Sequence, residues 1–265
     1  MPLAVEHIRR MRGGAQSHLM RCDDGAYYVV KFQNNPQHRR VLANEMLATR
    51  LAARLGLPVP GVEVVEVPAE LIALAADLVM QLGLGRTPCK AGRQLGARFP
   101  GDPARTVVHD FLPDDSLREV ENLCDFAGML VFDKWTCNTN GRQAVFFFEP
   151  GKSRRQAMMI DQGFCFNAGE WNFPDAPLRG LYLRHRVYEQ VTGIESFEPW
   201  LGRIEQRMNS EVLGEIAEQI PPDWYNHELD ELAQLLARLD QRRGRVRELI
   251  VQARNSDRQP FVNWK

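Results

Sequence analysis

The sequence predicts an α+β protein of two lobes, the first rich in β-strands and the second mainly helical. Three observations indicate this. Short β-branched and aromatic runs separated by glycine turns occupy much of residues 1–99, and apolar residues at helical spacing dominate the end of the chain. A Pro-Gly-Asp-Pro stretch at residues 100–103 is the best candidate for a hinge. We therefore expect an N-terminal lobe of residues 1–101 and a C-terminal lobe of residues 102–265.

The overall composition excludes several classes of protein. With 265 residues, 44% of them apolar, the chain can bury a sizeable core. Its formal net charge of -1 excludes nucleic-acid binding through bulk charge. The five cysteines are scattered, with no Cys-x-x-Cys pair, which argues against a zinc site or disulfide framework and favours a reducing, cytoplasmic compartment. We see no signal-peptide core and no run near the roughly 18 apolar residues that span a bilayer.

The first strands should form around two turns. Residues 5–11 alternate weakly, residues 19–22 follow a Gly-Gly turn, and residues 27–32 follow an Asp-Gly turn. Paired glycines let backbone N–H groups approach an anion closely, so Gly14, Ala15, Gln16 and Ser17 are candidates for a phosphate-binding turn. An ordinary hairpin turn is the commoner interpretation of this pattern.

A lysine and a glutamate in the first lobe are candidates for an ion pair. Lys31 lies in the third expected strand, between Val30 and Phe32, where a lone lysine is usually solvated. A helix is expected over residues 38–55, closed by Gly56, with Glu45 at the edge of its apolar stripe. Beyond it we expect a strand over 62–67, a helix from Pro68 to about residue 81, and a strand over 93–99.

The second lobe should open on a helix that leads to an acid. Ser116 and Glu119 have the spacing of a capping box, and apolar residues then continue at helical spacing to Val131. Asp133 and Asn138 follow, five positions apart, in what reads as a polar loop.

Two apolar strands joined by a Pro-Gly turn come next, and the second ends on Asp161, two residues before Gly163. Two acids and an amide brought together by a hairpin could hold a divalent metal and orient a hydroxyl.

The remainder should be helical, over residues 181–191, 197–207, 210–219 and 228–253. An arginine cluster at positions 242, 243, 245 and 247 reads as the solvated face of the last helix, with a phosphate- or partner-binding patch as the alternative. Between Asp161 and Trp171 there is no serine or threonine, which argues against regulation by phosphorylation in that loop.

The glycine turn, strand lysine, helix glutamate, Asp-x4-Asn and Asp-x-Gly, in this order, resemble the protein-kinase-like superfamily over most of the chain. Within it, Gly14-Ala15-Gln16, the Asn44-Glu45 helix ending in Leu-Gly-Leu-Pro-Val-Pro, and Ile-Asp161-Gln-Gly163 are similar to the HipA-like kinases. The stretch Phe-Asp133-Lys-Trp-Thr-Cys-Asn138 also resembles the same family. Phosphatidylinositol kinases share part of this pattern.

The resemblance implies ATP-dependent phosphoryl transfer with Mg²⁺ as cofactor. Lys31 would contact the α- and β-phosphates with Glu45 holding it, and backbone amides of residues 14–17 would cover the phosphates. Asp161 and Asn138 would be metal ligands. Asp133 would orient the acceptor hydroxyl. Lys134 would face solvent or the γ-phosphate.

Two departures from the family pattern limit what is carried over. His18 stands where the family's phosphate loop usually has a lysine, and the chain is shorter than the toxin kinases. We therefore carry over fold and nucleotide chemistry, not a toxin role. Three hypotheses stay open: an active kinase of a protein, small molecule or lipid; a nucleotide-binding pseudokinase or scaffold; and an α+β interaction protein with chance matches. As the acceptor of the phosphate, a protein serine, a sugar or a lipid head group would each need only a hydroxyl near Asp133.

Overall fold

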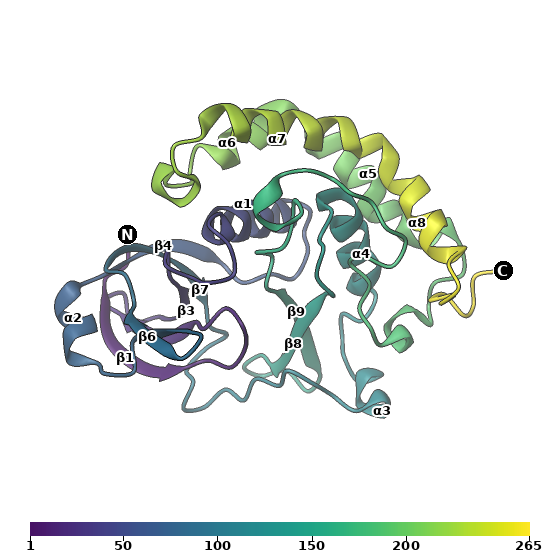
Figure 1. Cartoon of the computed structure of the whole chain (residues 1–265). Helices are drawn as coiled ribbons and strands as arrows, with labels where there is room; N and C mark the ends of the chain where they lie inside the picture. The colour runs from purple at the N-terminus through teal and green to yellow at the C-terminus, as the bar shows by residue number, and fades with distance from the viewer.

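A five-stranded antiparallel sheet forms the N-terminal part of the computed structural model, which describes residues 1–265 (Figure 1). It contains β1 (Ala4–Arg10), β2 (His18–Cys22), β3 (Tyr27–Lys31), β4 (Val62–Val67) and β7 (Gly92–Arg98), in the order β1-β2-β3-β7-β4. Strand β4 reads Val-Glu-Val-Val-Glu-Val, and Val65 and Val67, two positions apart, are fully buried on one face of the sheet. The expected strands of this region are confirmed.

The helix expected from Pro68 to residue 81 is mostly wrong. Only α2 (Ala69–Leu74) is helical, and none of its residues is buried. The chain leaves the helix at Ala75 with an extended backbone, and β5 (Val79–Leu82) and β6 (Gly85–Pro88) then form a separate hairpin. Met80 is buried in the core beneath the N-terminal sheet, so tertiary burial overrides the helical propensity of this stretch.

The helix α1 (Val41–Arg54) follows the sheet's third strand but packs mainly with the C-terminal part of the chain. It belongs to the larger apolar cluster, of 52 buried residues, which Val62 and Leu95 of the sheet also join, whereas the other face of the sheet has a cluster of only 11. Figure 1 shows α6 (Ser210–Ala217) and α7 (Leu229–Arg242) passing over α1, and α6 contacts it. The position of α1 is therefore set by the helical half of the molecule together with β4 and β7.

The continuous helix expected from Ser116 to Val131 is wrong, because two helices are separated by a non-helical stretch. The first, α3 (Asp114–Leu117), begins after Pro113 with no side-chain cap, and α4 (Asp125–Thr136) begins after Cys124. Between them the chain lies beside the hairpin of β8 (Gln143–Phe148) and β9 (Arg155–Ile160). There Asn122 bonds both to the amide and to the carbonyl of Ala157. These contacts replace the expected capping box.

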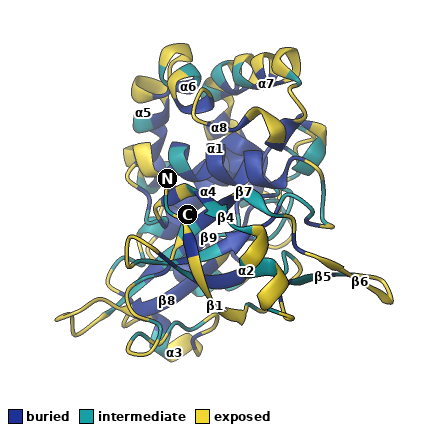
Figure 2. Cartoon of the chain, turned by 90° about the vertical axis from the view of Figure 1, so that its left-hand side faces the viewer, coloured by how far each residue is buried: buried dark blue, intermediate teal, exposed yellow.

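The C-terminal helices are α5 (Glu198–Arg207), α6, α7 and α8 (Val246–Arg254), with exposed outer faces and buried inner faces (Figure 2). The helix expected over 228–253 is broken by a 3-10 turn at Arg243–Arg245. The one expected over 181–191 shrinks to a 3-10 turn at His185–Tyr188, since the amide of Tyr182 bonds to the Tyr188 hydroxyl instead. None of the helices combines the length and apolarity needed to cross a bilayer. The α+β class, with its β-rich first part and helical second part, is confirmed.

Candidate functional site

Lys31, Glu45 and Asp161, which are far apart in the sequence, meet in one ion cluster. The Lys31 ammonium lies 2.8 Å from Glu45 Oε2 and 2.8 Å from Asp161 Oδ1. It stands at the end of β3, Glu45 is on α1, and Asp161 follows β9. Burial alone would lower the pKa of Lys31, but the two carboxylates raise it above its ordinary value, so the lysine stays charged.

Asp161 is held in a backbone conformation that aims its carboxylate at this cluster. Its φ of +62° is in the left-handed region, directly after the last residue of β9. Gln143 donates to Asp161 Oδ2 at 2.9 Å. Burial raises the pKa of Asp161, but the charge and hydrogen bond of Lys31 outweigh it, so the pKa is lowered and the carboxylate is ionised.

Gly163 is needed because the chain passes close to α1. A Cβ atom there would lie 2.8 Å from Val41 Cγ2 and 3.3 Å from Glu45 Oε2. The Asp-x-Gly pattern thus has a packing reason: the glycine lets the segment after Asp161 approach the helix that carries Glu45.

The glycine turn between β1 and β2 offers unpaired amides. Gly13 has a φ of +111° and its carbonyl accepts from the Gln16 amide, whereas the amides of Gly14 and Ala15 donate to no other backbone group. Asn35 donates to the Ala15 carbonyl at 2.8 Å and so ties the turn to the segment after Lys31. Ser17 is buried at the end of the turn.

The Gln16 side chain does not extend into solvent. Its amide bonds to the backbone N–H and carbonyl of Gln81 at 2.7 and 3.0 Å. The β5–β6 hairpin thereby supports the turn.

His18, at the family's lysine position, points into the sheet. It is fully buried, lies 3.0 Å from His7 through ring nitrogens, and approaches the Cys89 sulfur at 3.9 Å. Burial lowers the pKa of His18 to about 4, so the ring is neutral at pH 7. It cannot replace a cationic phosphate contact.

Asp133 does not lie in a polar loop. It is in the last turn of α4, 1% exposed, and Arg142 holds it with two hydrogen bonds, from Nε to Oδ2 at 2.8 Å and from Nη2 to Oδ1. Asn138 Nδ2 also donates to Asp133 Oδ1, at 3.0 Å. All but one residue of α4 are buried, which explains why the sequence gives no polar face to mark the helix.

The Asn138 loop runs beside the segment after Asp161. The Phe166 amide donates to the Thr136 carbonyl at 2.6 Å, and the Thr139 amide to the Phe164 carbonyl at 3.2 Å. Asp161 offers an ionised carboxylate, and Asn138 offers an amide oxygen that already accepts from the Asn140 amide at 3.1 Å. Oxygens of these types suit Mg²⁺, which needs few protein ligands when phosphates and water complete its shell. No group of three or more His, Cys, Asp or Glu side chains could hold a metal alone.

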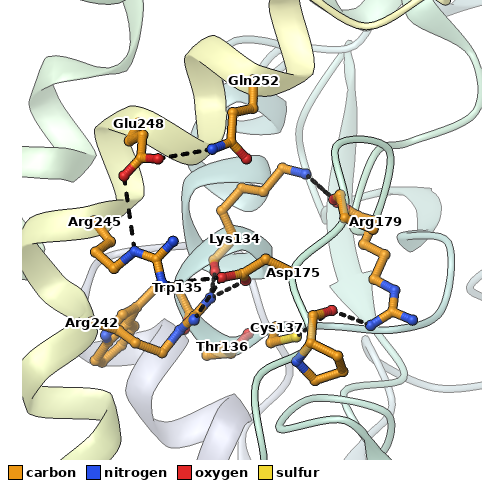
Figure 3. A network of polar contacts seen from close by, with 12 residues as sticks. Lys134, Trp135, Thr136, Cys137, Asp175, Arg179, Arg242, Arg245, Glu248 and Gln252 are labelled. Atoms are coloured by element: carbon orange, nitrogen blue, oxygen red, sulfur yellow. Dashed lines mark hydrogen bonds and ion pairs between the residues drawn. The ribbon is translucent and has the colours of Figure 1, made fainter.

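Residues 174–181, which we call the covering segment, close over Asp133. A Cβ atom on Gly180 would lie 2.4 Å from Asp133 Cβ. Lys134 does not face solvent, contrary to expectation: its ammonium donates to the carbonyls of Ala176 and Pro177 at 3.3 and 2.7 Å. It also donates to the carbonyl of Arg179 at 2.8 Å (Figure 3). Burial lowers the pKa of Lys134 to about 8.

Arg242 fixes the other end of the covering segment, so the expected solvated arginine face is wrong at this position. It is 6% exposed and bonds to Asp175 at 2.7 Å and to the carbonyls of Lys134 and Trp135 at 2.9 and 3.0 Å (Figure 3). These carbonyls have no partner within α4, and a cation there also complements the helix dipole.

Sequence reasoning missed Arg142 and Gly180 entirely. A charged residue directly before an apolar strand was the only signal for Arg142, and nothing in the pattern marks Gly180 as a neighbour of Asp133. Asn44 was recognised only as part of a motif, although its side chain is fully buried.

A family model described as HipA-like kinase matches residues 4–253 of the chain. No curated protein matches it significantly.

Several solved structures have a similar fold, and some of them are named as kinases. The Helicobacter pylori proinflammatory kinase CtkA has a TM-score of 0.59 at 16% identity, covering 94% of this chain and 96% of that one. A Golgi casein kinase with Mn/ADP bound has a TM-score of 0.54 at 11% identity, covering 98% and 74%. Hydra Fam20 with sugar has a TM-score of 0.56 at 11% identity, covering 97% of this chain and 87% of that one. At these identities the likeness shows the fold, which is protein-kinase-like.

Proposed function

Since the chain belongs to the HipA-like kinase family, we propose that it is an ATP- and Mg²⁺-dependent phosphotransferase that moves the γ-phosphate to a hydroxyl acceptor. The observation that carries this proposal is the meeting of Lys31 with both Glu45 and Asp161 at 2.8 Å. In protein kinases, a lysine held by a glutamate lies beside a metal-binding acid. The Mn/ADP in one structure of similar fold supports a nucleotide and a divalent metal.

In this proposal the nucleotide lies between the lobes of residues 1–101 and 102–265. Lys31 contacts the α- and β-phosphates, Glu45 orients its ammonium, and the amides of residues 14–17 cover the phosphates. Asp161 and Asn138 hold the metal, which supplies positive charge against the charge of the transferring group. Because His18 is neutral and buried, the phosphates receive no side-chain cation from that position.

Asp133 orients the acceptor hydroxyl, and its surroundings set a condition on that role. Arg142 and Asn138 occupy its carboxylate, and Gly180 lies against its side chain. An acceptor therefore reaches Asp133 only when the covering segment moves or Arg142 changes partner. A protein serine or threonine fits this arrangement, and so does a small-molecule or lipid hydroxyl.

The experiment is incubation with γ-labelled ATP and Mg²⁺, alone and with cell lysate, followed by detection of labelled products. The account expects label on the chain itself or on an acceptor, and a loss of about 10²- to 10⁴-fold in the Asp133→Asn variant. Unchanged transfer in that variant contradicts the role of Asp133.

A nucleotide-binding scaffold is the second candidate, favoured by one observation. Asp133 is 1% exposed and doubly bonded to Arg142, which is unusual for a group that must meet a substrate. ATP binding without any transfer, to the chain or to lysate components, would select this candidate.

A further inference from the structure

The buried amide of Asn44 joins α1 to the turn that follows Asp161. Its Nδ2 donates to three backbone carbonyls, those of Gly163, Cys165 and Ala168, at 3.0, 3.0 and 2.6 Å. Its Oδ1 accepts from Trp171 Nε1 at 2.7 Å. Asn44 directly precedes Glu45, so the same helical turn binds the turn after Asp161 and presents the glutamate to Lys31.

Arg40 makes a second connection, one helical turn before Asn44. Its Nη1 donates to the Gly169 carbonyl at 2.9 Å, and its guanidinium lies 4.0 Å from the centre of the Trp171 ring. The remaining nitrogens bond to Glu228 Oε2, through Nε at 3.1 Å and through Nη2. Arg40 is 3% exposed, while Glu228 immediately precedes α7 and its side chain is 27% exposed. Arg39 also pairs with Glu228, at 3.1 Å.

These contacts fix α1, the turn after Asp161 and the start of α7 against one another. If α1 moved away, Asn44 would lose its carbonyl partners on the turn after Asp161. Glu45 would at the same time move away from Lys31, which is also bonded to Asp161. In many kinases the corresponding helix is placed by a phosphate on the loop after the metal-binding acid, through an arginine. Here residues 161–181 contain no serine, threonine or tyrosine that could carry such a phosphate.

We propose that Arg40 and Asn44 are positioning residues of the phosphotransfer site, and that Glu228 gives Arg40 a permanent anionic partner in place of a regulatory phosphate. The site is then assembled by the fold alone, and the protein is active without covalent modification. This inference rests on the proposed function and adds its mode of regulation.

The test compares two ion pairs of α1. Glu228→Gln removes the charge that holds Arg40 but keeps the size of the side chain. The matched control is Glu215→Gln, because Glu215 pairs with Arg54 at 3.3 Å at the other end of α1, where both side chains are more than half exposed. Each variant is assayed for kcat and KM of ATP, and Lys31 is labelled with an amine-reactive reagent and quantified by mass spectrometry.

We expect Glu228→Gln to lower kcat about 10- to 100-fold with a smaller change in KM, since misplaced groups lose transition-state positioning. Lys31 labelling should rise as Glu45 leaves it. Arg40→Lys should act in the same direction, because lysine lacks the planar fork that reaches both Glu228 and Gly169. Glu228→Asp, which keeps the charge, should retain most activity, and Glu215→Gln should match the wild type.

Wild-type kcat and labelling in Glu228→Gln would overturn the inference, and so would equal losses in Glu228→Gln and Glu215→Gln. Activity that depends on phosphate found on the purified protein would also overturn it. If the wild type transfers no phosphate, the proposed function fails, whereas Lys31 labelling still reports on the position of α1.

Discussion

The two ion clusters of the site differ in how they are assembled. The Lys31 cluster joins three elements that are distant in sequence, and its side chains are 5–16% exposed. The Asp133 cluster is built within ten residues, its paired side chains are 0–1% exposed, and the covering segment closes it. The first cluster depends on how α1 is held and is slightly more exposed, while the second is complete within a short stretch of chain and fully buried. In the proposed function, the nucleotide half of the site is therefore assembled, and the acceptor half is closed.

The largest effect should come from breaking the closed cluster. Arg142→Met leaves Asp133 buried without a cation, which should cost about 3–5 kcal/mol of unfolding free energy. Urea unfolding measures it. The double variant Arg142→Met, Asp133→Asn should recover part of the loss, because the buried charge is gone. A loss below ~1 kcal/mol would mean that water reaches Asp133 freely.

Next in size is the contact that closes this cluster. Gly180→Ala should destabilise the protein by about 2–4 kcal/mol, because its φ is +77° and the new Cβ would overlap Asp133. Gly151→Ala is the control, with a φ of +78° and no atom within 4 Å, and should cost only about 1 kcal/mol. Equal losses would show that the covering segment yields easily.

Breaking the more accessible cluster should cost less. Lys31→Met leaves Glu45 and Asp161 without their cation, and we expect a loss of about 2–3 kcal/mol at pH 7, reduced by partial hydration. Lys31 lowers the pKa of Asp161, so the stability that this pair supplies is present above about pH 4 and is lost as the pH falls through the folded-state pKa. The difference between wild type and variant in pH-dependent urea unfolding should therefore narrow below about pH 4. A difference independent of pH contradicts the assignment.

The smallest effect is expected from His18 and tests whether this histidine is uncharged in the folded protein. The pKa of folded His18 is about 4, below the ordinary 6.5, so the unfolded chain binds a proton in this window that the folded chain does not. Stability should then fall as the pH drops from 6.5 to 4, by on the order of 1–2 kcal/mol after allowance for partial solvation. His18→Gln should show a flatter slope in the same unfolding assay. Equal slopes would mean that His18 titrates normally.

The accessible cluster was largely predictable from sequence. Lys31, Glu45 and Asp161 lie in elements with clear patterns, and a lysine strand, a glutamate helix and an acid after a strand occur in the order that kinases require. The contacts that bring these elements together are harder to predict from the sequence. Asn44 and Arg40 look like ordinary polar helix residues until their partners on the turn after Asp161 are known.

The closed cluster was harder to predict, for two physical reasons. The helical spacing was recognised only as far as Val131, and the polar residues that follow it are buried in the last turn of α4, so Asp133 was assigned to a loop. The covering segment has no regular pattern, and its position depends on the long-range contacts of Lys134 and Arg242. The helices predicted over residues 68–81 and 181–191 were wrong for a similar reason, because tertiary contacts overrode local helical spacing.

The most direct test of the two-part site is calorimetric Mg-ATP binding by three proteins, supported by thermal shift. We predict that the wild type and Asp133→Asn bind Mg-ATP with similar affinity, because an asparagine at position 133 keeps an oxygen that can accept from Asn138 and Asp133 itself is assigned no contact with the nucleotide or the metal. We predict that Lys31→Met binds at least about tenfold more weakly. Equal weakening in Asp133→Asn and Lys31→Met, or no binding by the wild type, would contradict it.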